Sequence, residues 1–132
     1  MPRQRLTRLA EALLRTEGWP CDAELDLWMC TDEEIQGLNR EHRGLDRPTD
    51  VLSFPQYEPG ERPVAGLPAA LGDVVISVDT AARQAAERGA SLSAETAWLF
   101  AHSVLHLLGY DDDTEEGLAT MIAKAKAALA AM

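Results

Sequence analysis

The sequence predicts one α+β domain over residues 1–132, in which a small mixed sheet packs against several helices. Two observations predict this class. Short segments with strand patterns are followed by a cluster of segments with helical spacing, and no internal repeat divides the chain. With 132 residues, the chain has the commonest domain size and can bury about two-thirds of the surface that its unfolded form exposes.

The first half of the chain alternates helical and strand patterns. Apolar residues at spacings of three, four, seven and eight predict an amphipathic helix, which Gly18 and Pro20 end. Alternating apolar and polar residues then predict a strand. Thr31 and Glu34 have the spacing of a capping box, which opens the next helix, and a short apolar run before Pro55 predicts a second strand. These elements span residues 5–16, 23–30, 32–43 and 51–54.

A long loop and a buried strand follow. Residues 55–72 contain four prolines and three glycines, which predicts a long surface loop. The segment "DVVISV" over residues 73–78, which is mostly apolar and β-branched, predicts a buried strand. Asp79 or Thr80 is then expected to cap a helix that runs to about residue 87.

The last part of the chain is predicted to be helical. Ser93 is expected to open a helix over residues 94–108, which is apolar around most of its circumference and therefore buried. Gly109 is placed to end this helix. Thr114 is expected to cap a last helix that runs to about residue 130.

Composition restricts the class of protein. Apolar residues make up 46% of the chain, as in ordinary globular proteins. No apolar run is long enough to span a bilayer, and the start of the chain has no continuous apolar leader segment, so we predict a cytoplasmic protein with no membrane partner. Cys21 and Cys30 are nine residues apart, outside any metal-binding pattern, and are predicted to be structural thiols.

The charge distribution leaves room for a local phosphate site. A formal net charge of −10 argues against a protein that coats nucleic acid with its whole surface. Ten of the twelve basic residues are arginines, whose planar guanidinium group suits phosphate.

Two histidines on the buried helix predict a metal site. His102 and His106 are four residues apart, so their imidazoles lie on the same face of a helix and can bind one ion. A third ligand has to come from elsewhere, and a left-handed turn at Gly109 can bring Asp112 back over the histidines. The alternative is a pair of hydrogen-bonded core histidines beside an acidic helix cap at residues 111–113.

The pattern His102-x3-His106-x2-Gly109-x2-Asp112 has the spacing found in zinc endopeptidases with the signature HExxHxxGxxH. In those enzymes a glutamate after the first histidine is the general base, whereas this chain has Ser103. A peptidase is therefore disfavoured. A site of two histidines and one carboxylate also suits iron, which we rank last because oxygenases with such sites have a different spacing.

Three separated stretches together resemble one family. "LNREHRGLDRPTDVLSFP", "LGDVVIS" and "HSVLHLLGYDD" are similar, in order and spacing, to the LN-x2-YR…TDVLSFP, GDI-x-I and HGxLHLxGYDH blocks of the bacterial YbeY family. The resemblance implies a single-strand-specific, metal-dependent endoribonuclease that acts in ribosomal RNA maturation, notably at the 3′ end of the 16S RNA, and in ribosome quality control. It implies single-stranded ribosomal RNA and the small ribosomal subunit as partners.

The resemblance also implies site residues. The family's zinc ion is held by three histidines, of which the first two fall on His102 and His106 and the third falls on Asp112. We therefore expect one zinc ion per chain, held by these three residues. The conserved arginine of the first block falls on Arg43, which is the expected catalytic residue.

A basic patch surrounds the predicted catalytic arginine. Arg40, Arg43 and Arg47 form the densest basic patch in the chain and are predicted to bind the RNA substrate. For Arg40 and Arg47, a charged loop face with no substrate contact is the alternative. No side chain is identifiable as the general base. A non-catalytic function, as a metal-binding factor in ribosome assembly, stays open beside the nuclease.

Overall fold

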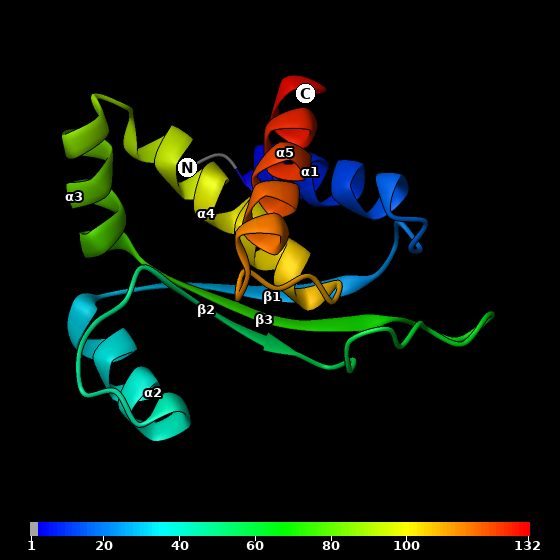
Figure 1. Ribbon diagram of the computed structural model, residues 1–132, viewed down its shortest axis with the longest axis horizontal. Coiled ribbons are helices and arrows are strands. Elements are labelled where there is room, and N and C mark those ends of the chain that lie inside the picture. The colour runs from blue at the N-terminus through cyan, green and yellow to red at the C-terminus, as the bar shows by residue number, and fades with distance from the viewer. Residues whose placement is uncertain (1–2) are drawn as a thin grey trace.

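The computed structural model describes residues 3–132, which form a three-stranded sheet and five helices (Figure 1). The predicted α+β class with a small mixed sheet is confirmed. The elements are α1 (Arg3–Thr16), β1 (Glu24–Cys30), α2 (Asp32–Arg43), β2 (Val51–Pro55), β3 (Ala70–Ser77), α3 (Val78–Arg88), α4 (Leu92–Leu107) and α5 (Glu115–Ala130). None of these described helices is long and apolar enough to cross a membrane.

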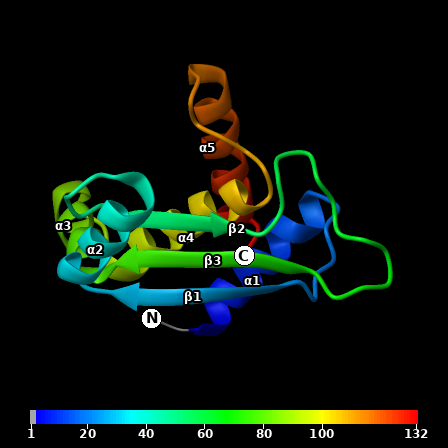
Figure 2. The ribbon, with the colours of Figure 1, turned by 90° about the horizontal axis from the view of Figure 1, so that it is seen from below.

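The sheet has the order β1-β3-β2. β1 runs parallel to β3, and β2 runs antiparallel to it. Figure 2 shows the three strands side by side, with the loop over residues 56–69 extending beyond one end of the sheet. Parallel neighbours need a long crossover connection, and here residues 31–69, which include α2 and β2, provide it.

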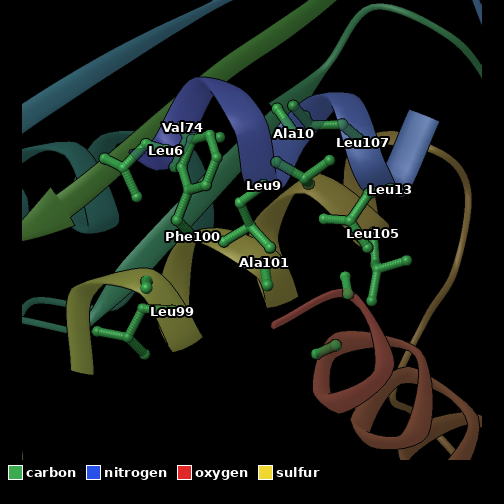
Figure 3. Packing of buried hydrophobic residues seen from close by; sticks show 14 of the residues in the cluster. Leu6, Leu9, Ala10, Leu13, Val74, Leu99, Phe100, Ala101, Leu105 and Leu107 are labelled. Carbon is green, nitrogen blue, oxygen red and sulfur yellow. The ribbon is translucent and has the colours of Figure 1, made fainter. Parts of the chain in front are cut away.

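The main core lies between the sheet and three helices. α1, α4 and α5 are on one side of the sheet and α2 is on the other (Figure 1). Leu9 of α1, Leu105 of α4 and Val74 of β3 are fully buried in this core (Figure 3). α4 contacts β2, β3, α1, α3 and α5, which explains why its sequence is apolar around most of the helix.

A smaller core lies under α2. Ile35 of this helix is fully buried against Cys30, Leu52 and Val75 of the three strands. Burial raises the pKa of the Cys30 thiol to about 11, and the nearby carboxylates of α2 add to the effect. The thiol is therefore protonated at neutral pH and unreactive. Both cysteines are free, as predicted.

Several helix caps that the sequence predicts are present in the structure. The capping box is present: Glu34 donates its backbone N–H to Thr31 Oγ1 at 3.2 Å, and Thr31 donates its own to Glu34 Oε1 at 3.0 Å. Gly89 ends α3 in the left-handed conformation, with φ at 65°. Thr114 caps α5 by accepting the backbone N–H of Gly117 at 2.9 Å.

α1 begins at Arg3, two residues earlier than predicted, and three further predicted boundaries were wrong. β3 begins at Ala70, inside the predicted loop, because its ladder with β1 extends to the pair Glu24↔Ala70. α3 is capped by Ser77 and not by Asp79 or Thr80, since the ladder ends at Ser77 and the helix starts directly after it.

The third wrong boundary is the start of α4. Ser91, and not Ser93, is its N-cap, and it accepts the backbone N–H of Ala94 at 3.0 Å. The helix therefore begins two residues earlier than predicted, at Leu92. Both serines can cap a helix, so sequence alone did not separate them.

Asp32 joins the starts of α2 and α3. Its Oδ1 accepts hydrogen bonds from Ser77 Oγ and Thr80 Oγ1, each at 2.6 Å, and its Oδ2 accepts from Arg83 Nη2 at 2.8 Å. Burial raises the pKa of this carboxyl, but the three hydrogen bonds outweigh burial and hold the pKa below its ordinary value of 3.8.

We expect Asp32→Asn to lower the free energy of unfolding by about 1–2 kcal/mol at neutral pH, because the charged acceptor is lost. A carboxyl with a lowered folded-state pKa stabilises the fold above its unfolded value of 3.8 and loses that contribution as pH falls through the folded-state pKa. The difference between variant and wild type should therefore shrink as pH falls below 3.8 and disappear once the pH is below the folded-state pKa. Urea unfolding from neutral to acid pH measures this difference in the free energy of unfolding. Asp22→Asn is the control, because Asp22 is exposed. A difference that persists in acid would contradict the assignment.

Candidate metal centre

The structure brings the three predicted ligands together. His102 Nε2 lies 3.2 Å and His106 Nε2 lies 3.7 Å from Asp112 Oδ2, and the ligand atoms of the three residues lie within 4.8 Å of one another. The two imidazoles lie on one face of α4, with ring centroids 4.8 Å apart. Their side chains are 19% and 26% exposed and that of Asp112 is 41% exposed, so the group opens to solvent on the carboxylate side.

The turn after α4 places the aspartate. Gly109 has φ at 105°, a left-handed conformation that favours glycine, and its N–H donates to the carbonyl of His106 at 3.0 Å. The chain then packs against the first turn of α5. A Cβ atom at Gly117 would lie only 2.6 Å from the carbonyl oxygen of Asp111, so a glycine there allows this close approach. The two glycines thus permit the loop that carries Asp112.

A hydrogen bond orients the second histidine. His106 Nδ1 lies 3.0 Å from the carbonyl oxygen of Tyr110. A carbonyl oxygen only accepts, so Nδ1 carries the proton and Nε2 presents its lone pair to the side where Asp112 lies. Backbone carbonyls commonly play this part for metal-binding histidines.

Tyr110 itself is anchored to two helices. Its hydroxyl donates to Glu17, at the end of α1, and Lys124 Nζ of α5 lies 2.8 Å from the other carboxylate oxygen of Glu17. Burial raises the pKa of Glu17, but hydrogen bonds from Lys124 and Tyr110 outweigh burial and hold it below its ordinary value. The network ties the loop next to Asp112 to α1 and α5. Sequence reasoning missed this network, because its members are far apart in the chain.

The donor set fits a small divalent ion. Ligand atoms about 2.1 Å from a tetrahedral ion lie about 3.4 Å from one another. The separations of Asp112 Oδ2 from the two imidazole nitrogens, 3.2 and 3.7 Å, are close to this value. Three protein ligands would leave one position of a tetrahedral ion open, as in catalytic zinc sites, whereas structural sites use four protein ligands.

The ligands and Arg43 line one cleft with a volume of about 560 Å³. β2 and the end of α2 line it together with α4. Arg43 Nη1 donates to Asn39 Oδ1 at 3.4 Å, and Asn39, which is 1% exposed, donates its own side-chain N–H to the Arg47 carbonyl at 2.9 Å. The buried asparagine therefore holds both the arginine and the loop that follows α2.

The other two arginines of the basic patch lie outside the lining of this cleft. Arg40 pairs with Asp46 at 3.3 Å, where both side chains are 63% exposed, and it lines a different hollow beside Trp28. Arg47 is exposed in the loop before β2. Their part in RNA binding stays a prediction.

Ser103, where a peptidase would carry its glutamate, points to the sheet. It is fully buried, and its hydroxyl lies 2.6 Å from that of Ser53 in β2. The position therefore presents no carboxylate to a water molecule. Two other residues of the cleft were missed in the sequence: Arg88, at the end of α3, and Trp98, on α4. Trp98 stands four residues before His102, which is a signal that the helical spacing contained.

Comparison with known proteins supports a single family. A sequence model described as "Endoribonuclease YbeY" matches residues 2–132. The endoribonuclease YbeY of Pelotomaculum thermopropionicum is 54% identical over 113 residues, which cover 84% of this chain and 73% of that protein. That of Moorella thermoacetica is 48% identical over 129 residues, which cover 95% of this chain and 83% of that protein.

A solved structure also has this fold. The solution structure of TM1509 from Thermotoga maritima has a TM-score of 0.63 and 26% sequence identity, and the match covers 96% of this chain and 81% of that chain. The family match spans almost the whole chain and includes the histidines, Asp112 and Arg43. On this evidence, the chain belongs to the endoribonuclease YbeY family.

Proposed function

We propose that this protein is a metal-dependent endoribonuclease that cleaves single-stranded ribosomal RNA, with the 3′ end of the 16S RNA as a substrate and a part in ribosome quality control. One observation carries the proposal: the same cleft contains three side chains that could hold a metal ion and an arginine held by a buried asparagine. Membership of the family supports the reaction class.

His102, His106 and Asp112 would hold the ion, and we propose zinc. Imidazole nitrogen and carboxylate oxygen are both ordinary zinc ligands, and the separations of Asp112 Oδ2 from the two imidazole nitrogens are close to those expected around a tetrahedral ion. When bound, such an ion polarises a phosphoryl oxygen and lowers the pKa of water. The carbonyl of Tyr110 keeps His106 in the tautomer that such binding needs.

Arg43 would hold the scissile phosphodiester. A guanidinium group has five N–H donors, and the bond to Asn39 uses one of them. The remaining donors can bind a phosphate in a bidentate manner and stabilise negative charge that develops during cleavage. Arg43 is exposed, so it can reach a substrate in the cleft without first breaking a buried ion pair.

The test compares Arg43→Ala with Arg15→Ala. We expect Arg43→Ala to lower the rate of cleavage of a single-stranded RNA by about 100-fold, because a transition-state contact is lost. The melting temperature should change little, since an exposed arginine is removed. Arg15, which is exposed in the last turn of α1 and lies outside the lining of the cleft, is the matched control and should leave the rate nearly unchanged.

The preparation should carry no affinity tag, so that its metal content can be measured directly. Chelation should abolish RNA cleavage, and added zinc should restore it. Metal-loaded protein that binds the small ribosomal subunit without cleaving RNA would instead indicate an assembly factor. Cleavage of casein without cleavage of RNA would indicate a peptidase.

A further inference from the structure

A tryptophan shares the ligand face of α4. Trp98, His102 and His106 follow one another at intervals of four residues, so each lies one turn, or about 6 Å, beyond the last along the same helix face. All three line the cleft. Trp98 is partly buried: one part of it packs against the main core, and the rest is accessible from the cleft.

An arginine is held next to this tryptophan. Arg88 Nη1 lies 3.4 Å from Glu95 Oε1, and Glu95 stands three residues before Trp98 on α4. Glu95 is only 2% exposed, so its carboxylate is a fixed, buried anchor, whereas the side chain of Arg88 is 56% exposed and lines the cleft. One oxygen of the anchor engages the guanidinium group, which leaves other N–H donors free.

Arginines therefore reach the cleft from two helices. Arg43 comes from the last residue of α2 and Arg88 from the last residue of α3, and these helices lie on opposite sides of the sheet at the same end (Figure 1). Each guanidinium is tied to a buried side chain, Asn39 for Arg43 and Glu95 for Arg88. An RNA strand with successive phosphates can thus be held at two points, Arg43 and Arg88. An aromatic ring and the predicted metal ligands lie in the same cleft.

We propose that Trp98 and Arg88 form a nucleotide subsite beside the metal centre, where an unpaired base stacks on Trp98 and an adjacent phosphate binds Arg88. The proposal rests on the proposed function. Stacking on an aromatic side chain needs a base whose face is free, and every base has such a face. The subsite therefore selects single-stranded RNA with little preference for sequence.

The experiment measures binding and not turnover. The probe is a fluorescent single-stranded oligonucleotide with 2′-O-methyl and phosphorothioate groups, which resists hydrolysis, and a duplex of the same length is measured beside it. We expect Trp98→Leu, which keeps an apolar side chain, to weaken single-strand binding about tenfold, and Trp98→Phe to stay within about threefold of wild type. Binding of the duplex should not change. Trp28→Leu is the control, since Trp28 is 44% exposed on β1 and lines other hollows.

Arg88 is tested by its salt dependence. Arg88→Met should weaken binding and reduce the slope of log affinity against log salt by about one, as expected when one phosphate contact is lost. Arg83→Met is the matched control, because Arg83 is also on α3, is 58% exposed and also pairs with a carboxylate. Its salt slope should equal that of wild type.

The outcomes separate the two proposals. If wild type cleaves RNA but Trp98→Leu binds the single strand as tightly as wild type, the subsite is wrong and the nuclease stands. An equal loss on single strand and duplex would also overturn the subsite. If wild type neither binds nor cleaves single-stranded RNA, both proposals fail. If Trp98→Leu does not fold, tryptophan fluorescence of the Trp28→Phe protein tests the subsite instead. Trp19 is buried, so Trp98 is then the tryptophan that the oligonucleotide can reach, and binding should quench its emission. Unchanged emission would overturn the subsite.

Discussion

Replacement of His106 with alanine is expected to remove the bound metal and to lower the rate of RNA cleavage by at least about a thousandfold. A bound divalent ion supplies several kcal/mol of charge stabilisation in such reactions, and each 1.4 kcal/mol corresponds to about a factor of ten in rate. His102→Ala should have the same effect, since both nitrogens face the same carboxylate oxygen. Metal content and cleavage rate, measured on the same samples, check this prediction.

Asp112 is the predicted ligand at which the chain departs from the three histidines that its family resemblance implies. Asp112→Ala should also lose the metal, whereas Asp112→His should retain it, because imidazole and carboxylate bind zinc at similar distances. Asp111→Ala and Asp113→Ala are the matched controls. The backbone N–H of Asp113 donates to Asp111 Oδ1 at 3.3 Å, so these two residues interact with each other within the loop. If Asp112→Ala keeps its full metal content while Asp111→Ala or Asp113→Ala loses the metal, that neighbouring aspartate is the ligand and the assignment to Asp112 is wrong.

Replacement of Gly72 with alanine is expected to destabilise the protein by about 3 kcal/mol or more. Gly72 lies in β3 with φ at 129°, a backbone conformation that residues other than glycine rarely adopt. A Cβ atom there would lie 2.0 Å from the carbonyl oxygen of Phe54 and 3.1 Å from Cα of Pro55. Both atoms belong to the backbone of β2, so the strand itself would have to move. Such a combination of strain and overlap is among the few causes of large losses of stability.

Urea unfolding measures this loss, and Gly37→Ala is the control. Gly37 lies inside α2, and a Cβ atom there would meet nothing within 4 Å. Alanine should therefore stabilise this helix by about 0.5–1 kcal/mol. Since β2 lines the cleft, Gly72→Ala should also weaken metal binding. Equal stability of Gly72→Ala and wild type would contradict the close approach of β2 and β3.

The sequence by itself determined the features that depend on residues within about four positions of each other. The capping box of Thr31 and Glu34, the left-handed Gly89 and the cap at Thr114 are of this kind, and all are present. The placement of His102 and His106 on one helix face is also local. These signals are hydrogen bonds and periodicities within a single element, so no knowledge of distant contacts is needed to read them.

Only the tertiary structure decided which distant residues meet at the site. Arg40, Arg43 and Arg47 have the same charge and are close in sequence, yet Arg43 alone of the three lines the cleft of the histidines. Arg88 of α3 and Trp98 of α4 line the same cleft, although both are distant from Arg43 in the sequence. The physical reason is that packing of α2, α3 and α4 on the sheet sets these distances. Similarly, the ladder between β1 and β3 placed the start of α3, because backbone pairing across the sheet overrode equally suitable local caps.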